Sequence, residues 1–182
     1  MNLINGLPAH VLLVHVVVVL VPLTALALVA SALWPPAARR LGVLLPLLAF
    51  VSLASVPLTT HAGEWLEAHV ESNALVRRHT ELGDGLLPWA LGLFVLAAVV
   101  WWTGRRAGAG SPGAASAGVV EGDGAGTATR WAAAPVRIVV AVLSLAVAVG
   151  AVVDVYRIGD SGAKAAWHDG FSKSASRSGD GD

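Results

Sequence analysis

The hydrophobic positions of the chain fall into four long stretches separated by polar connections. Residues 11–33 contain one histidine and no charged side chain, and residues 41–60, 86–102 and 138–153 contain no ionisable side chain at all. A helix rises about 1.5 Å per residue, so about 20 apolar residues cross the hydrocarbon layer of a bilayer. With their flanks, the stretches predict transmembrane helices over about residues 9–33, 41–61, 82–103 and 133–158. We therefore expect an all-α, up-down-up-down bundle of four helices, forming one membrane domain over residues 1–169.

Composition narrows the class of protein further. Of the 182 residues, 55% are apolar and 13% are charged, which excludes a soluble domain because such a domain needs a charged surface. Twelve Lys and Arg residues balance twelve Asp and Glu residues, so the net charge does not favour nucleic acid. The chain has no cysteine, which excludes disulfides, thiolate metal sites, iron–sulfur ligation and covalently attached haem. A small multi-pass protein of the lipid bilayer remains.

Basic residues predict the direction in which the helices cross the membrane. Arg39 and Arg40 lie between the first two spans, and Arg105, Arg106 and Arg130 lie between the last two. Connections rich in Lys and Arg usually face the cytoplasm. We therefore expect both termini on the extracytoplasmic side. Aromatic residues then mark the two interfaces: Trp34, Trp101, Trp102 and Trp131 the cytoplasmic one, and Trp65, Tyr156 and Trp167 the opposite one.

The connections differ in character. Residues 104–130 consist mainly of Gly, Ala and Ser, which predicts a flexible cytoplasmic linker. The tail over residues 170–182 is rich in Ser and Gly and is expected to be disordered. Residues 61–80 have the spacing of an amphipathic helix, and Ser72 or Asn73 is a candidate N-cap for a long third helix.

Ionisable side chains gather at one end of the predicted bundle. In an up-down-up-down arrangement, the starts of the first and third spans meet the ends of the second and fourth. This end collects His10, His15, His61, Glu64, His79, Glu81, Asp84, Asp154, Arg157 and Asp160. Any site for a cofactor or metal is therefore expected near the extracytoplasmic face.

His15 stands out because it lies within a Val-rich transmembrane stretch, where a polar side chain is expected to face the bundle and to have a partner. One interpretation is structural: a neutral imidazole that donates to a neighbouring helix. The other is axial ligation of haem b, with His79 as the second ligand and His10 as a secondary candidate. His79 reaches the depth of His15 if the third helix starts near Ser72. If that helix starts at Thr80, His79 instead matches His10 in depth.

A non-haem metal site is a weaker alternative. His10, His61, Glu64 and His79 offer suitable ligands, but no short-range ligand spacing supports such a site. If these residues bind a metal ion, the protein is a metal-binding membrane protein. If it binds no cofactor at all, it is a membrane scaffold or assembly protein.

Asp154 is the second informative residue. Ala146, Gly150 and Asp154 recur every four residues, which predicts a small-residue face for close helix packing. Asp84, Asp154 and Arg157 are expected to form a structural polar cluster. Residues 159–162 read Gly-Asp-Ser-Gly, the nucleophile motif of trypsin-like proteases, but an all-helical chain cannot build that catalytic site. We interpret these residues as a turn after the fourth helix, and no catalytic constellation is recognisable.

Four motifs carry a resemblance to a known family. They read Asn5-Gly6-Leu7-Pro8-Ala9-His10 with Leu13-Val14-His15, then Thr59-Thr60-His61-Ala62-Gly63-Glu64, His79-Thr80-Glu81-Leu82-Gly83-Asp84, and Tyr156-Arg157-Ile158-Gly159-Asp160-Ser161-Gly162-Ala163-Lys164. The chain thereby resembles domain of unknown function 2231. The resemblance implies a four-helix protein of the bacterial cytoplasmic membrane. Some relatives are joined to Rieske-type modules, which implies a redox or electron-transfer subunit that binds haem b and works with a redox protein.

The chain departs from its relatives at two positions. Many relatives have proline where this chain has Val11, and often histidine where it has Asp160. The second departure weighs against a ligand on the fourth helix.

Overall fold

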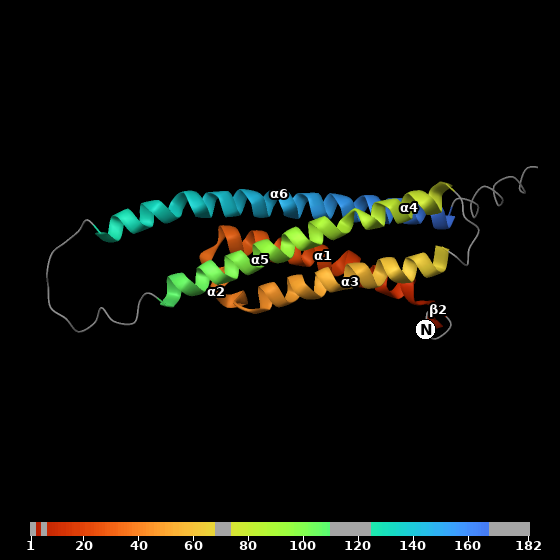
Figure 1. Cartoon of the computed structure of the whole chain (residues 1–182), viewed down its shortest axis with the longest axis horizontal. Helices are drawn as coiled ribbons and strands as arrows, with labels where there is room; N and C mark the ends of the chain where they lie inside the picture. Colours follow the sequence, from red (N-terminus) through yellow and green to blue (C-terminus); the bar gives the residue numbers. More distant parts are fainter. Residues whose placement is uncertain (1–2, 5–6, 68–73, 110–124, 168–182) are drawn as a thin grey trace, which may run out of the picture.

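The computed structural model describes residues 3–4, 7–67, 74–109 and 125–167. Nearly all of them are helical (Figure 1). The helices are α1 (Ala9–Leu33), α2 (Pro35–Leu41), α3 (Leu44–Glu67), α4 (Ala74–Asp84), α5 (Leu86–Ala109) and α6 (Ala125–Trp167). Two short strands, β1 (Leu3–Ile4) and β2 (Leu7–Pro8), pair antiparallel before α1.

Four helical segments are long and apolar enough to cross a membrane: His10–Leu33, Leu44–Trp65, Ala74–Arg106 and Pro135–Trp167. Both α1 and α5 pack against α3 and α6. The all-α bundle of four spans that the apolar stretches predict is confirmed. The start of α1, the end of α3, α4 and the end of α6 lie together at one end, which we call the histidine end, and α2 lies at the other (Figure 1).

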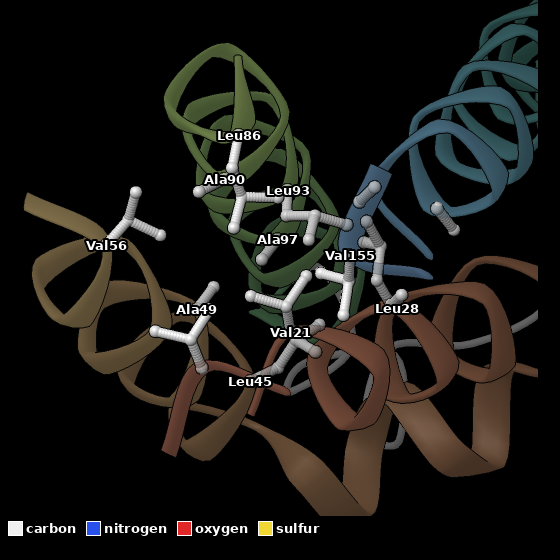
Figure 2. Close-up of a cluster of buried hydrophobic side chains, with 14 of the residues drawn as sticks. Val21, Leu28, Leu45, Ala49, Val56, Leu86, Ala90, Leu93, Ala97 and Val155 are labelled. Carbon is white, nitrogen blue, oxygen red and sulfur yellow. The ribbon is translucent and has the colours of Figure 1, made fainter. Parts of the chain in front are cut away.

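Small and branched apolar side chains fill the centre of the bundle (Figure 2). Val21, Leu28, Leu45 and Leu93 are fully buried there, whereas many other large apolar side chains, such as Leu26 and Ile138, are exposed. In a bilayer such outward-facing side chains contact lipid, so helix association depends on packing and hydrogen bonds rather than on burial from water.

Hydroxyl groups form a buried seam between α1 and α3. The Thr24 and Ser52 hydroxyl oxygens lie 2.7 Å apart, and both residues are buried. Ser55 and Thr59 continue the seam toward the histidine end, and each donates to a carbonyl of its own helix. A hydrogen bond between transmembrane helices contributes about 0.6 kcal/mol on average, so the seam fixes the rotation of α3 more than it stabilises the fold.

Close contact between α5 and α6 depends on glycine. A Cβ atom added at Gly150 would lie 2.2 Å from Cζ3 of Trp89, and one at Gly92 would lie 3.0 Å from a methyl group of Val147. The Trp89 indole therefore lies directly on the backbone of α6. The predicted small-residue face is present at Gly150 and Asp154, whereas Ala146 is exposed.

The third span is broken near its start. Gly85 separates α4 from α5 and donates to the Leu82 carbonyl, 3.1 Å away. Pro88 explains the break, because it has no N–H for the Asp84 carbonyl and its ring clashes with that carbonyl in a regular helix. The third helical segment has begun by Ala74, in line with a start near Ser72, which itself lies outside the described residues.

Two connections differ from the sequence interpretation. Helix α5 continues through Ala109 and α6 starts at Ala125, so both ends of the predicted linker over residues 104–130 are helical. Alanine, the best helix former, is frequent there. Residues 159–162 are also helical, because α6 continues to Trp167, and their interpretation as a turn is wrong. The predicted disordered tail over residues 170–182 lies outside the described residues.

The end of the bundle opposite the histidine end carries anchoring side chains. The Arg105 guanidinium lies 5.1 Å from the centre of the Trp101 ring, and that of Arg106 lies 4.9 Å from the centre of the Trp102 ring. Arginine stacked on tryptophan suits the boundary between lipid and water.

Candidate functional site

His10 connects α1 to α3 at the histidine end. Its Nδ1 lies 3.0 Å from the carbonyl oxygen of Thr59. The imidazole reaches this carbonyl by lying over Gly63, where an added Cβ would be 3.0 Å from His10 Cε1 and 3.1 Å from Nδ1. Gly63 is one helical turn beyond Thr59, so only a residue without a side chain leaves room for the ring at this distance.

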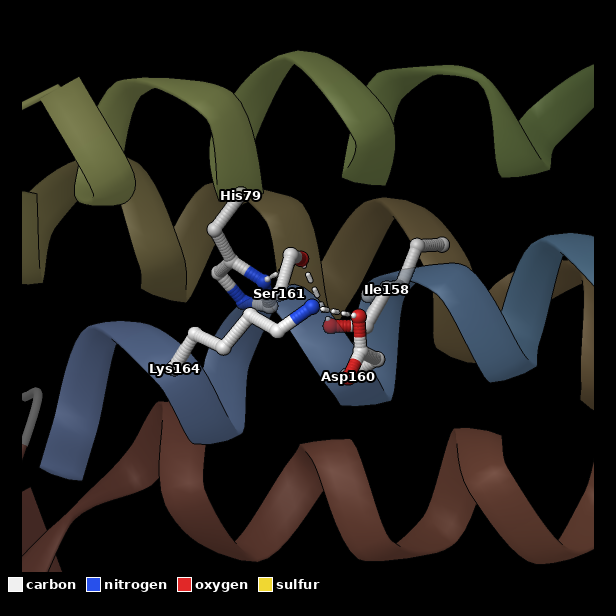
Figure 3. A network of polar contacts seen from close by, with 5 residues as sticks. All are labelled: His79, Ile158, Asp160, Ser161 and Lys164. Atoms are coloured by element: carbon white, nitrogen blue, oxygen red, sulfur yellow. Dashed lines mark hydrogen bonds and ion pairs between the residues drawn. The ribbon is translucent and has the colours of Figure 1, made fainter. Parts of the chain in front are cut away.

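His79 connects α4 to α6 in a similar way (Figure 3). Its Nδ1 lies 3.0 Å from the hydroxyl oxygen of Ser161, and that hydroxyl donates to the Ile158 carbonyl at 2.8 Å. The ring lies over Gly162, where an added Cβ would be 3.0 Å from His79 Cε1. Ser161 is buried, so this contact is shielded from competing groups.

The two imidazoles meet at the centre of the histidine end. Their ring centroids are 6.2 Å apart, and the ring planes are nearly perpendicular at 85°. A carbonyl oxygen can only accept, so His10 Nδ1 carries a proton. The Ser161 hydrogen is directed to Ile158, so His79 Nδ1 also donates. In the neutral form each histidine therefore has an Nε2 lone pair that can bind a metal or a proton, and no hydrogen bond within the described residues uses it.

The two contacts form equivalent units. Each consists of a histidine early in one helical segment and a glycine near the end of the helix it packs on. Gly63 lies four residues before the end of α3, and Gly162 lies five residues before the end of α6. The first unit joins α1 to α3, and the second joins α4 to α6. The sequence alone shows no internal repeat that reveals this relation.

His15 does not join this pair. Its side chain is exposed, and its Nδ1 donates to the Val11 carbonyl of its own helix at 2.6 Å. The expectation that His15 faces the bundle is wrong. On an ideal helix it lies about 140° from His10, and His10 is the one that faces inward. His79 therefore lies beside His10, even though the third helical segment begins early enough to reach the depth of His15.

His61 and Glu64 also lie apart from the pair. They face each other across one turn of α3, with 3.4 Å between His61 Nδ1 and Glu64 Oε2, and their side chains are 88% and 66% exposed. Among the described residues, no group of three His, Asp or Glu side chains is arranged to hold a metal ion.

The expected polar cluster of Asp84, Asp154 and Arg157 is formed only in part: the charge of Arg157 acts on the Asp154 carboxyl group, whereas no hydrogen bond or ion pair joins Asp84 to either residue within the described part of the chain. Asp84 is exposed. The Oδ2 atom of Asp154 is buried and has no hydrogen-bond partner there, and an added Cβ at Gly85 would lie 3.7 Å from it. Arg157 lines a groove between α4 and α6. Asp154 thus lies at the break between α4 and α5.

Sequence reasoning found both histidines but missed their supporting residues. Thr59, Gly63, Ser161 and Gly162 hold or face the imidazoles. The sequence contains one signal for these residues, a glycine one helical turn after the residue whose carbonyl accepts a hydrogen bond. Gly63 follows Thr59 in this way, and Gly162 follows Ile158. Such spacing is common in transmembrane helices, so it becomes informative only when the facing histidine is known.

A family model described as a predicted membrane protein, DUF2231, matches residues 6–175. The chain belongs to this family. The matched region contains both histidines and both facing glycines. No curated protein and no solved structure matches the chain. Family membership and the four long apolar helices together make it a membrane protein with several spans.

Proposed function

We propose that this protein binds haem b through His10 and His79 and serves as a redox or electron-transfer subunit of a bacterial cytoplasmic membrane, with both termini and the histidine end on the extracytoplasmic side. The observation that carries the proposal is the convergence of two imidazoles, each held at Nδ1 by an acceptor, with a separation of 6.2 Å between ring centroids. Hydrogen bonds at Nδ1 are the usual way in which a protein orients a histidine ligand.

The donor set favours haem over a bare metal ion. A structural zinc site needs about four protein ligands, and a catalytic one about three. The pair of His10 and His79 offers two, and no third ligand joins them in the described ranges. Haem iron receives four nitrogens from its macrocycle, so two histidines complete its coordination. When bound, haem b would supply one-electron transfer. The Thr59 carbonyl and the Ser161 hydroxyl orient the two imidazoles that would hold it.

One observation favours a second candidate function, a scaffold without any cofactor. Each histidine already joins two helices by a hydrogen bond, His10 to α3 and His79 to α6. Such bonds stabilise a bundle without any ligand, so both functions require the same two residues.

Absorption spectra of the full chain, purified in detergent after expression with ample haem, distinguish the two functions. We expect a Soret band that sharpens on reduction with dithionite, together with split visible bands. His10→Ala and His79→Ala are expected to remove these bands. His15→Ala and His61→Ala are matched controls, because both side chains are exposed, and they are expected to retain the bands.

The opposite results are equally clear. A colourless protein without extractable haem, in which His10→Ala and His79→Ala lower the melting temperature, supports the scaffold function. Loss of haem in His15→Ala together with retention in His10→Ala contradicts the ligand pair proposed here. A colourless protein that binds one zinc ion per chain would show that the ligand of this site is a metal ion and not haem.

A further inference from the structure

A groove of about 310 Å³ runs between α4 and α6 beside the histidine pair. Arg78 on α4 and Arg157 and Lys164 on α6 bring three positive charges to its lining, and Asp160 brings one negative charge. Ser161 also reaches the groove, so the groove is next to the hydrogen bond that holds His79.

The charges in the groove are not balanced. Lys164 Nζ is 2.7 Å from Asp160 Oδ2, so these two neutralise each other (Figure 3). Arg78 has no ion pair with any residue in the described ranges, and the charge of Arg157 acts on the carboxyl group of Asp154. Two guanidinium groups from different helices thus line one groove whose acidic side chain, Asp160, is paired with Lys164. Guanidinium groups bind phosphate in a bidentate manner, which makes them the usual choice for phosphate recognition.

The groove also has an apolar wall. Leu75 and Leu82, two helical turns apart on α4, line it together with Arg78. A ligand that carries a phosphate and an alkyl chain satisfies both parts of the lining, whereas a free inorganic anion uses only the charged part.

The depth of the groove matches the headgroup layer of a bilayer. Arg157 lies four residues beyond the uncharged stretch that ends at Val153, and Arg78 lies eight residues before the stretch that starts at Leu86. At about 1.5 Å per residue these positions are about 6 and 12 Å beyond the hydrocarbon edge, and a long arginine side chain reaches several ångströms along the helix from its own position. Phospholipid phosphates occupy this layer.

We propose that this groove binds one anionic phospholipid, with its phosphate held between Arg78 and Arg157 and an acyl chain that passes Leu82 toward the hydrocarbon layer. Basic pockets between transmembrane helices are known places for anionic headgroups. The proposal is independent of haem, because its side chains are not the imidazoles.

Native mass spectrometry of the detergent-solubilised full chain tests this. The probes are phosphatidylglycerol, phosphatidylcholine with the same acyl chains, and inorganic phosphate. We expect one retained phosphatidylglycerol, and about thirtyfold weaker binding in the double variant Arg78→Gln with Arg157→Gln, since each of the two cations near a membrane surface contributes about 1 kcal/mol. Arg77→Gln is the matched control: Arg77 is exposed and adjacent on α4, and the variant should bind like the original chain.

A second variant guards against loss of binding through misfolding. Asp160→Asn frees Lys164 from its ion pair and is expected to strengthen phosphatidylglycerol binding several-fold, an effect that a damaged protein does not produce. Equal binding of phosphatidylcholine, or unchanged binding in both the double variant and Asp160→Asn, overturns the proposal. Displacement of the lipid by inorganic phosphate at low millimolar concentration also overturns it, because the groove would then be a site for a soluble anion.

Discussion

At the scale of single residues, the histidine pair depends on two residues that have no side chain. An imidazole reaches a helix carbonyl, or a hydroxyl close to the backbone, only where the facing helix surface is flat. Gly63 provides that surface for His10, and Gly162 provides it for His79. The chemistry of the site therefore comes from the histidines, and its geometry comes from the glycines.

Gly63→Ala and Gly162→Ala should each weaken the histidine end. The new methyl group would approach an imidazole to 3.0 Å, so the ring must move by a few tenths of an ångström and its hydrogen bond lengthens. Overpacking of this kind costs about 1–3 kcal/mol. Thermal unfolding in detergent, followed by circular dichroism, measures the change.

The control for this experiment is Gly159→Ala on the same helix as Gly162. An added Cβ at Gly159 meets nothing within 4 Å, so this variant should gain up to about 1 kcal/mol from helix propensity. If all three variants shift the melting temperature in the same direction, the imidazoles do not depend on the glycine surfaces.

At the scale of helices, α5 packs closely on α6 where the Trp89 side chain lies against the backbone of Gly150. The Trp89 indole covers Gly150 more closely than any side chain there would allow. Without a hydrophobic driving force between helices in lipid, such close packing is a main source of helix association.

Gly150→Ala should destabilise the bundle more than Gly92→Ala does. The added methyl group would lie 2.2 Å from the indole at Gly150, against 3.0 Å from a flexible Val147 methyl group at Gly92. We expect a loss near the upper end of the 1–3 kcal/mol range for overpacking. The double-mutant cycle with Trp89→Leu measures the coupling. An equal cost of Gly150→Ala in both backgrounds would show that the indole does not restrict this position.

At the scale of the whole molecule, the bundle has two unlike ends. One holds the histidine pair and the basic groove, and the other holds the short helix α2 with Arg39 and Arg40 and the Arg105 and Arg106 guanidiniums stacked on tryptophan. Six of the twelve Lys and Arg residues lie on the side of each end, but ten of the twelve acidic residues lie on the side of the histidine end. The arginines of the second end thus have few acidic residues near them in the sequence, which predicts that this end faces the cytoplasm.

Single-cysteine labelling tests this orientation without interference, because the chain has no cysteine of its own. Ala163→Cys lies on the exposed surface of α6 at the histidine end, and Ser116→Cys lies in the connection between α5 and α6. A membrane-impermeant maleimide should label Cys at position 163 in intact spheroplasts and Cys at position 116 only after permeabilisation. The reverse pattern places the histidine end in the cytoplasm.

Sequence reasoning reaches the fold because the length and apolarity of the four stretches leave few arrangements in a bilayer. It reaches the site only in part. The inventory of polar residues finds His10 and His79, but the first span is apolar on all sides, so its pattern does not show which face turns inward. Depth alone then favours His15, whereas the contacts with Thr59 and Gly63 select His10. The break between α4 and α5 at Gly85 arises because Pro88 cannot donate to the Asp84 carbonyl. A hydropathy pattern does not record this effect.

The two histidine–glycine units divide the bundle into two hairpins. One hairpin, α1 with α3, contains the His10 contact, and the other, α4–α5 with α6, contains the His79 contact. The two imidazoles belong to different hairpins, so they come to lie 6.2 Å apart only where the hairpins associate. Any site that uses both histidines therefore reports that the two halves of the chain have assembled.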